Sequence, residues 1–380
     1  MKSNAQRFRN SLVMAIVAAV LFSIVPSRAH AGQAATGGER TADLPQIENA
    51  KLTRRAATHP LAEEMKTWAE AASEAQWLGY VVPAVKGDRV MCCGGNWNGN
   101  GNCGNCRLED GDHGNTYSSA KPTVALEGPR KIILLYRAQG KKIGKIRMVS
   151  EDCMLDAGGL QVTWLANVNP AESVQLLAGF VNNSNAVARD EDKLSQSALA
   201  AIAMHGDPAA DSAMRSFIAP ERPESLRKEA AFWLGAARGS SGEQLLEQMA
   251  KKDPSPEVRS QVVFALSVSK EARAMDEIIR MAHDDSSAHV RGQALFWLAQ
   301  KAGAKAEQTI IGAIENDPET EVKKKAVFAL SQMPKDEGVP KLIEVAQSNR
   351  NPEVRKQAMF WLGQSGDPRA LAFFEKILSK

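Results

Sequence analysis

The sequence predicts a two-part fold: an α+β N-terminal domain followed by an all-α superhelix (solenoid) of repeated helix pairs. Three observations support this prediction. A 32-residue repeat runs through residues 193–380, β-prone segments are concentrated between residues 77 and 165, and all five cysteines lie upstream of residue 154. A chain of 380 residues is long enough for two domains of this kind.

The first 31 residues have the order of a secretory signal peptide. Lys2, Arg7 and Arg9 precede an almost wholly apolar stretch over residues 12–25, and the small residues Ala29 and Ala31 follow it. We therefore expect cleavage after Ala31 and a periplasmic or extracellular location. The apolar stretch is shorter than the ~20 residues that a spanning helix needs, and an uncleaved N-terminal anchor is the alternative.

Cleavage would change the charge of the chain. The whole chain has a formal net charge of +3, and residues 1–31 carry four basic and no acidic side chains, so the mature chain has a net charge of −1. A nearly neutral protein has no general field that attracts nucleic acid. No other apolar segment approaches spanning length. We expect neither a nucleic-acid partner nor a membrane span after cleavage.

The repeat is carried by columns of residues spaced 32 positions apart. An arginine column contains Arg227, Arg259, Arg291, Lys323 and Arg355. A phenylalanine column contains Phe232, Phe264, Phe296, Phe328 and Phe360. Within each unit the apolar residues recur at helical spacing, which predicts two short amphipathic helices per unit. Such helices bury their apolar faces only by stacking on neighbouring units, and we expect about six units, the first of them degenerate.

These units resemble the short HEAT-like repeats first named from phycobilin lyases, within the armadillo-like class of α solenoids. The resemblance is clearest at Pro352-Glu353-Val354-Arg355 and at Gly366-Asp367-Pro368. It implies a right-handed stack of helical hairpins, an α-α superhelix with a surface for a partner. It says little about function, because such repeats serve many roles.

Two of the columns allow functional interpretations. The arginine column either binds an anionic ligand or forms a structural ladder, in which each guanidinium pairs with an aspartate at a neighbouring turn such as Asp253 or Asp285. The phenylalanine column lies away from the main core face by helical angle. It either packs between successive units or forms an exposed aromatic stripe that binds protein.

Upstream of the repeats we expect a flexible arm over residues 32–59 and a small α+β domain over residues 60–182. An amphipathic pattern predicts a helix over residues 61–77. β-prone segments predict strands over residues 77–82, 131–137, 142–149 and 161–165, with a turn at residues 138–141. A further helix is expected from Asn169 to about Val181, and a polar linker over residues 182–192 then leads to the repeats.

The small domain contains every cysteine of the chain. The five cysteines are Cys92, Cys93, Cys103, Cys106 and Cys153. Disulfides are the expected state of an exported protein, and five cysteines leave one thiol unpaired in a pairing that sequence does not determine.

A zinc site and a redox pair are the alternatives for this cysteine loop. Cys103-x-x-Cys106 has zinc-knuckle spacing, and Cys92, Cys93 or His113 would complete the ligands. The same two cysteines would form a redox pair, although no thioredoxin-like pattern surrounds them. The c-type haem attachment pattern fails, because Arg107 stands where it requires a histidine. Apart from the zinc alternative, no cofactor is expected.

Other candidate sites are weaker. Glu109, Asp110 and Asp112 lack the spacing of an EF-hand and are expected in a solvated loop. No nucleotide-binding loop, zinc-protease motif or nucleophile elbow occurs. The histidines of the repeats, His205, His283 and His289, lie in or near turns and are expected at the surface.

Three functions follow from these features. The first is an exported scaffold or adaptor whose solenoid holds a protein partner of the cell envelope. The second is a redox- or metal-responsive sensor that uses the cysteine loop. The third is a bilin-lyase-like enzyme, which the resemblance implies and which export opposes. The scaffold is the interpretation that the repeats favour, and it predicts no catalytic residues. The sequence does not indicate an oligomeric state.

Overall fold

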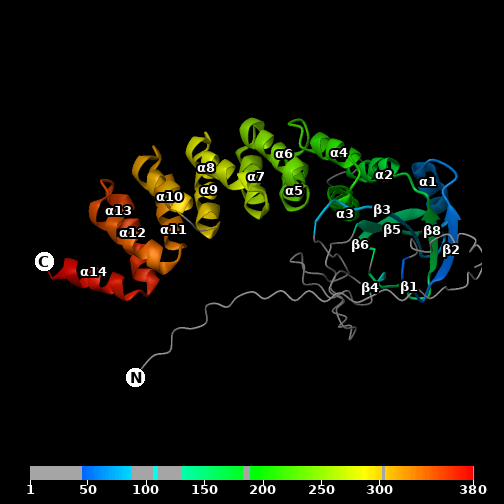
Figure 1. The fold of residues 1–380 in the computed structure, drawn as a ribbon, viewed down its shortest axis with the longest axis horizontal. Helices are drawn as coiled ribbons and strands as arrows, with labels where there is room; N and C mark the ends of the chain where they lie inside the picture. The colour runs from blue at the N-terminus through cyan, green and yellow to red at the C-terminus, as the bar shows by residue number, and fades with distance from the viewer. Residues whose placement is uncertain are drawn as a thin grey trace, which may run out of the picture. The chain divides into compact units, whose positions relative to one another are not determined.

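A computed structural model of the protein describes residues 45–87, 106–109, 130–151, 153–182, 189–301 and 304–379. An N-terminal region of strands and helices is followed by a long series of helices, which confirms the predicted fold class. Figure 1 shows helices α3 to α14 following the sheet-bearing region in chain order. None of the helices in the described residues is long and apolar enough to cross a membrane. Residues 1–31, the expected signal peptide, lie outside the described residues.

The N-terminal region is built on a five-stranded mixed sheet with strand order β2-β8-β3-β5-β6. Its strands are β2 (Lys51–Ala56), β3 (Gln76–Pro83), β5 (Lys131–Gln139), β6 (Lys142–Ser150) and β8 (Gln161–Ala166). Strands β5 and β6 form the predicted hairpin, whose turn has positive φ at Gly140 and Lys141. Consecutive positive φ angles suit a tight hairpin turn, because they match the twist of the flanking strands.

The prediction of a flexible arm is wrong for residues 45–59. β1 (Ile47–Glu48) and β2 lie in this range, and β2 pairs in parallel with β8 over its whole length. Strand β2 is an edge strand with mostly exposed side chains, so it has no alternation of apolar and polar residues to reveal it. Its hydrogen-bond partner lies more than 100 residues away, and local sequence cannot report such a pairing.

The predicted helix over residues 61–77 is also too long. Helix α1 (Leu61–Ala71) ends before Trp77, which pairs with Arg137 inside strand β3. Helix α2 (Pro170–Asn182) agrees with its prediction, and α3 (Arg189–Met204) begins inside the predicted linker. Pairing within the sheet therefore decides where the helical pattern of residues 61–77 stops.

Each face of the sheet has its own apolar core. One face, which includes Tyr80, Leu134 and Tyr136, belongs to a core that also contains α1, α2 and the repeat helices. The other face, which includes Trp77 and Trp164, packs against a small three-stranded sheet. The strands of that small sheet, in order, are β1, β7 (Leu155–Asp156) and β4 (Cys106–Arg107).

A short backbone junction joins the sheet to the repeats. Beyond the end of β3, the N–H of Val85 donates to the carbonyl of Met204 at 2.8 Å, and the N–H of Gly206 donates to the carbonyl of Pro83 at 2.7 Å. A Cβ atom on Gly206 would lie 2.5 Å from the carbonyl oxygen of Ala84. Glycine is therefore required for this close approach.

The repeats of the described chain form six helix pairs, as the 32-residue period predicts. The first helices of the pairs are α3, α5 (Glu224–Ala237), α7 (Pro256–Val268), α9 (Ala288–Lys301), α11 (Thr320–Ser331) and α13 (Pro352–Ser365). The second helices are α4 (Ala209–Phe217), α6 (Gly239–Lys252), α8 (Arg273–Asp284), α10 (Ala304–Asn316), α12 (Lys335–Ser348) and α14 (Pro368–Leu378). The leucine column, which contains Leu234, Leu266, Leu298, Leu330 and Leu362, is fully buried throughout.

Helix starts follow local capping chemistry. The side chain of Ser255 accepts a hydrogen bond from the N–H of Val258 at the start of α7. Asn351 and Asp367 do the same for α13 and α14, and each of these three helices has proline in its first turn. A side-chain acceptor followed by proline satisfies or removes backbone donors that a helix N-terminus otherwise leaves unpaired.

Two glycines in one repeat column test how closely the first helices pack. A Cβ atom on Gly235 would lie 2.1 Å from the carbonyl oxygen of Ala265, whereas a Cβ atom on Gly363 meets nothing within 4 Å. We expect Gly235→Ala to lower the free energy of unfolding by about 2 kcal/mol, because α5 and α7 must separate. Gly363→Ala should raise it by up to about 1 kcal/mol, since alanine favours the helix. Urea unfolding of both variants measures this, and equal effects would contradict the close contact.

Candidate functional site

The arginine column forms a series of ion pairs between consecutive units. Each of the first three arginines donates two hydrogen bonds to the aspartate 26 residues later, which stands before the next first helix. The pairs are Arg227 with Asp253 at 2.9 and 3.1 Å, Arg259 with Asp285 at 2.8 and 2.9 Å, and Arg291 with Asp317 at 2.8 and 3.0 Å. These guanidinium groups are held by the protein's own carboxylates.

Each aspartate of this ladder has a second role. Asp253 accepts the backbone N–H of Ser255 at 2.9 Å, and Asp285 and Asp317 accept equivalent bonds two residues downstream. The hydrogen bond with Asp285 raises the pKa of Arg259. Most of the paired side chains are buried, with Arg227 4% and Asp253 5% exposed. One buried carboxylate therefore shapes the turn and fixes the preceding helix to it.

The ladder changes at its fourth position. Lys323 donates to the carbonyl of Glu315 at 2.7 Å, and the residue 26 positions later is Asn349. Arg355 donates to the carbonyl of Asn349 at 2.8 Å. A lysine has no planar fork to bind a side chain at two points, and an asparagine carries no charge. The step from the fifth unit to the sixth therefore lacks the ion pair that fixes the three steps before it.

The phenylalanine column forms an unbroken series of aromatic contacts, which we call the aromatic ladder. Phe232 stacks on Phe264 with ring centroids 6.0 Å apart, and Phe296 stacks on Phe328 at 6.1 Å. Two tryptophans connect these stacked pairs: Trp297 lies 5.0 Å from Phe264, and Trp361 lies 4.9 Å from Phe328. The ladder continues through T-shaped contacts to Trp233 at one end and Phe360 at the other.

The aromatic ladder is neither core nor free surface. Phe232, Phe264, Phe296 and Phe328 are half-buried, while Phe360 is 54% exposed. The rings pack between successive units, which is the structural interpretation of the phenylalanine column. They also stay partly exposed, which the interpretation as a protein-binding stripe requires. Aromatic rings with this partial exposure are common anchors in protein interfaces.

The tryptophans of the ladder were not among the predicted site residues. Their column alternates Trp233, Ala265, Trp297, Ala329 and Trp361, so that each first helix carrying alanine adjoins helices carrying tryptophan. Trp297 and Trp361 reach back to the phenylalanines of the preceding units. The alternation of large and small residues in one column is the sequence signal that would have included them.

The described cysteines lie in the second core of the sheet. Cys106 and Cys153 are both buried, and both are disulfide-bonded in the structure. Arg147 lies beside them and donates to the carbonyl of Arg107 at 3.1 Å. Cys92, Cys93, Cys103 and His113 lie outside the described residues, so the pairing and the zinc alternative stay predictions.

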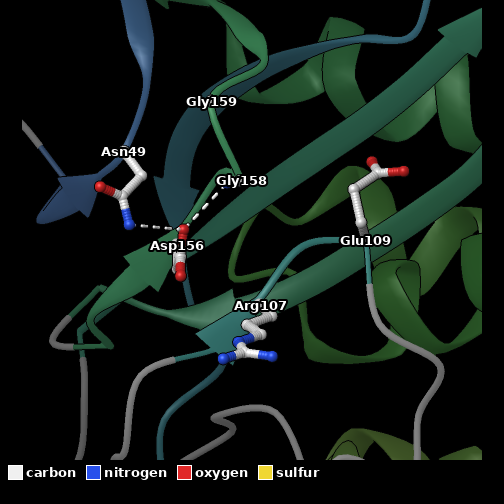
Figure 2. A pocket seen from close by; sticks show the side chains of 6 residues that line it. All are labelled: Asn49, Arg107, Glu109, Asp156, Gly158 and Gly159. Carbon is white, nitrogen blue, oxygen red and sulfur yellow. Dashed lines mark hydrogen bonds between the residues drawn. The ribbon is translucent and has the colours of Figure 1, made fainter.

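A pocket of about 450 Å³ lies beside the small three-stranded sheet. Figure 2 shows Asp156 between Asn49 and Gly158, from which it accepts hydrogen bonds of 3.1 and 2.9 Å. The hydrogen bond from Gly158, then that from Asn49, lower the pKa of Asp156. Arg107 and Glu109 lie on the neighbouring segment (Figure 2).

Glu109 is already engaged by protein groups. It accepts hydrogen bonds from the indole of Trp77 at 2.8 Å and from Nε of Arg137 at 2.9 Å. Burial raises its pKa, but the bonds from Arg137 and Trp77 outweigh burial and hold the pKa below its usual value. Asp110 and Asp112 lie outside the described residues. Among the residues that are described, no three His, Cys, Asp or Glu side chains gather as a metal site.

The histidines of the repeats differ from one another. His283 and His289 are exposed, as predicted, whereas His205 is completely buried. The prediction of a surface position is wrong for His205, because the junction with β3 covers it. Ala84 forms an isolated antiparallel bridge with His205, a contact between segments more than 100 residues apart.

Comparison with known proteins finds a family match in the helical part of this chain. The family model for HEAT repeats matches residues 212–299 and 307–380. No curated protein matches the chain.

Several solved structures are similar to parts of the chain. The complex of CpcE and CpcF of phycocyanin lyase from Nostoc sp. PCC7120 is 21% identical, with 41% of this chain and 99% of that chain covered and a TM-score of 0.31. Human deoxyhypusine hydroxylase in complex with glycerol is 15% identical, with 55% and 90% covered and a TM-score of 0.24. The S. pombe condensin Cnd3-Cnd2 subcomplex is 19% identical, with 52% and 28% covered and a TM-score of 0.33. Similarity at these levels carries no information about activity or partners.

The arginine column offers a matched test of the ion pairs. Arg291→Met would leave Asp317 buried without its cation, and we expect it to lower the free energy of unfolding by about 3–5 kcal/mol. Lys323→Met, in the same column but without a carboxylate partner 26 residues later, should cost less than about 1 kcal/mol. Chemical denaturation of the two variants gives this comparison. Equal losses would show that the pairs do not stabilise the stack.

The partial burial of the aromatic ladder predicts an intermediate cost of truncation. Phe296→Ala removes contacts with Trp297 and Phe328, and we expect it to lower the free energy of unfolding by about 2 kcal/mol, less than the 3–5 kcal/mol typical of a fully buried ring. Phe360→Ala, at the exposed end, should cost less than about 1 kcal/mol. Thermal unfolding checks both values, and a larger loss for Phe360→Ala would contradict its exposure.

Proposed function

We propose that this protein is an exported scaffold that binds a protein partner of the cell envelope along the aromatic ladder of its HEAT repeats. The proposal of export comes from the signal-like order of residues 1–31. The proposal of binding rests on one observation above the others: rings from five consecutive units form a continuous series of contacts, most of the rings are partly exposed, and the series ends at the 54% exposed Phe360.

The ion pairs support this use of the surface. Buried Arg–Asp pairs fix the three steps from the second unit to the fifth, so the rings on these units are held in place before a partner binds. A preorganised surface loses little side-chain entropy on binding, which favours affinity. The arginines themselves are occupied by aspartates, which favours the structural interpretation of that column over an anion site.

The other two functions stay hypotheses. The redox- or metal-responsive sensor depends on Cys92, Cys93 and Cys103, which lie outside the described residues. The bilin-lyase-like enzyme was implied by the family resemblance, and no observation on the described residues favours it. Cys106 and Cys153, buried in an apolar core, fit a structural disulfide better than a thiol that must be reached by solvent.

The first experiment tests whether the protein is exported and which protein it binds. The protein is expressed with its own N-terminus and a C-terminal tag, the cells are fractionated, and the mass of the mature protein is measured. We expect it in the periplasmic or extracellular fraction with residue 32 as its N-terminus. Mild crosslinking and capture then identify the bound protein. Retention of residues 1–31 in the cytoplasm would overturn the exported part of the proposal.

A matched pair of exposed apolar side chains tests the binding surface itself. Phe360 belongs to the aromatic ladder, whereas Leu371, which is 62% exposed, lies on the second helix α14 and not in the phenylalanine column. With the captured partner purified, we expect Phe360→Ala to raise the dissociation constant by about 30-fold, the effect of losing an aromatic anchor worth about 2 kcal/mol. Leu371→Ala should leave it unchanged. Equal changes of the dissociation constant in Phe360→Ala and Leu371→Ala would contradict binding along the aromatic ladder. An unchanged dissociation constant in both Phe360→Ala and Phe296→Ala would also contradict it.

A further inference from the structure

His205 sits at the only backbone junction that the described residues show between the end of β3 and the end of α3. The two cross-junction hydrogen bonds, from Val85 to Met204 and from Gly206 to Pro83, lie directly on either side of it. His205 is 0% exposed. Any event that changes the ring of His205 therefore acts on the connection between sheet and repeats.

The hydrogen bonds of His205 define its protonation state. Nδ1 accepts the backbone N–H of Asp207 at 3.1 Å, which requires that the proton of the neutral ring is on Nε2. Nε2 is itself buried and has no hydrogen-bond partner. A second proton can only go to Nδ1, and it would turn that acceptor into a donor facing the N–H of Asp207. Protonation and this hydrogen bond therefore exclude each other.

The charged groups around the ring of His205 would not neutralise the positive charge that protonation adds beside Arg238. Arg238 donates to the carbonyls of His205 at 2.6 Å and Ala203 at 3.2 Å, and its own partner is Asp211 at 2.6 Å. Asp207 provides a nearby negative charge, and its Oδ1 accepts the N–H of Ala209 at 2.8 Å. The strand side of the junction, Pro83 to Val85, is uncharged.

Burial is the main influence on this histidine. It lowers the pKa of His205 to about 4; Asp207 opposes the shift and Arg238 adds to it. An exposed histidine has a pKa near 6.5. The open junction therefore takes up a proton at a higher pH than the closed one. The stability that the closed junction gains from neutral His205 is complete above about pH 6.5 and is lost as the pH falls toward 4.

We propose that His205 is an acid-sensitive latch between the sheet and the helical repeats. At neutral pH the uncharged ring accepts the N–H of Asp207 and the strand end stays paired with the end of α3. In acid the ring takes a proton, loses that bond and places a second cation beside Arg238, so the strand end separates from the repeats. This latch does not depend on the proposed partner, because its residues lie outside the aromatic ladder.

Amide hydrogen exchange of the full chain tests the latch directly. The N–H groups of Val85 and Gly206 report opening of the junction, and amides in the middle of α9 serve as an internal reference. After correction for intrinsic exchange rates, we expect opening to increase roughly 70-fold from pH 7.5 to pH 4.5, given folded and exposed pKa values of about 4 and 6.5. The α9 reference should change much less.

His205→Asn is the decisive variant. An asparagine oxygen can accept the N–H two residues later in an Asx turn, so this change keeps the local hydrogen bond and removes the titrating ring. We expect His205→Asn to abolish the extra opening at pH 4.5. His283→Asn, at an exposed position, and Asp207→Asn, which tests the neighbouring carboxylate, should both leave the 70-fold response in place.

Two results would overturn the latch. One is a junction whose opening does not change with pH in the native protein, and the other is an unchanged response in His205→Asn. If His205→Asn does not fold, NMR titration of the His205 ring in the native protein decides the question. A ring that titrates near 6.5 while the junction stays closed would contradict the proposal. Protonation of the ring that coincides with faster exchange of the Val85 and Gly206 amides would support it.

Discussion

The buried arginine–aspartate pair is the interaction on which the order of the repeats depends. Burial of apolar surface drives neighbouring units to associate, but this interaction is non-directional and does not fix the position of one unit against the next. A guanidinium that binds one carboxylate at two points fixes both distance and direction. Because the same carboxylate shapes the turn before the next first helix, Asp253 and its equivalents connect the start of one unit to the body of the previous one. The aromatic contacts then follow from a spacing that is already set.

The N-terminal region contributes to the packing of the repeats. Its larger sheet contributes one face to the apolar core that continues through the repeats, and α3 of the first unit packs against β6. A solenoid needs its first unit covered, because that unit has no predecessor to bury its outer face. Here the sheet supplies the cover, and the hydrogen bonds around His205 fix where the two regions meet. The degenerate sequence of the first unit reflects this different neighbour.

The sequence predicted the features that repeat and missed those that depend on distant pairing. A column such as the one from Arg227 to Arg355 contains five related residues at equal spacing. Chance does not produce such a series, so the sequence alone predicts that these residues have equivalent positions in their units. Strand β2 and the buried position of His205 occur once, and each depends on a segment more than 100 residues away. The partial burial of the aromatic ladder could not be predicted from the sequence either. The helical angle separates the core face of a helix from its other faces. It does not distinguish a ring that packs between two helices from a ring that is exposed to solvent.

The arginine column loses its ion pair at the C-terminal end of the described repeats, whereas the aromatic ladder continues there. Between the fifth and sixth units, Lys323 and Asn349 stand in place of the arginine and aspartate, while Phe328 and Trp361 keep a ring contact of 4.9 Å. That step is therefore held by apolar and aromatic packing without the directional ion pair, and it adjoins the most exposed ring, Phe360. Packing contacts of this kind yield to small shifts more easily than a bidentate pair does. A partner bound along the ladder would thus meet rigid rings over the first units and an adjustable step at the last.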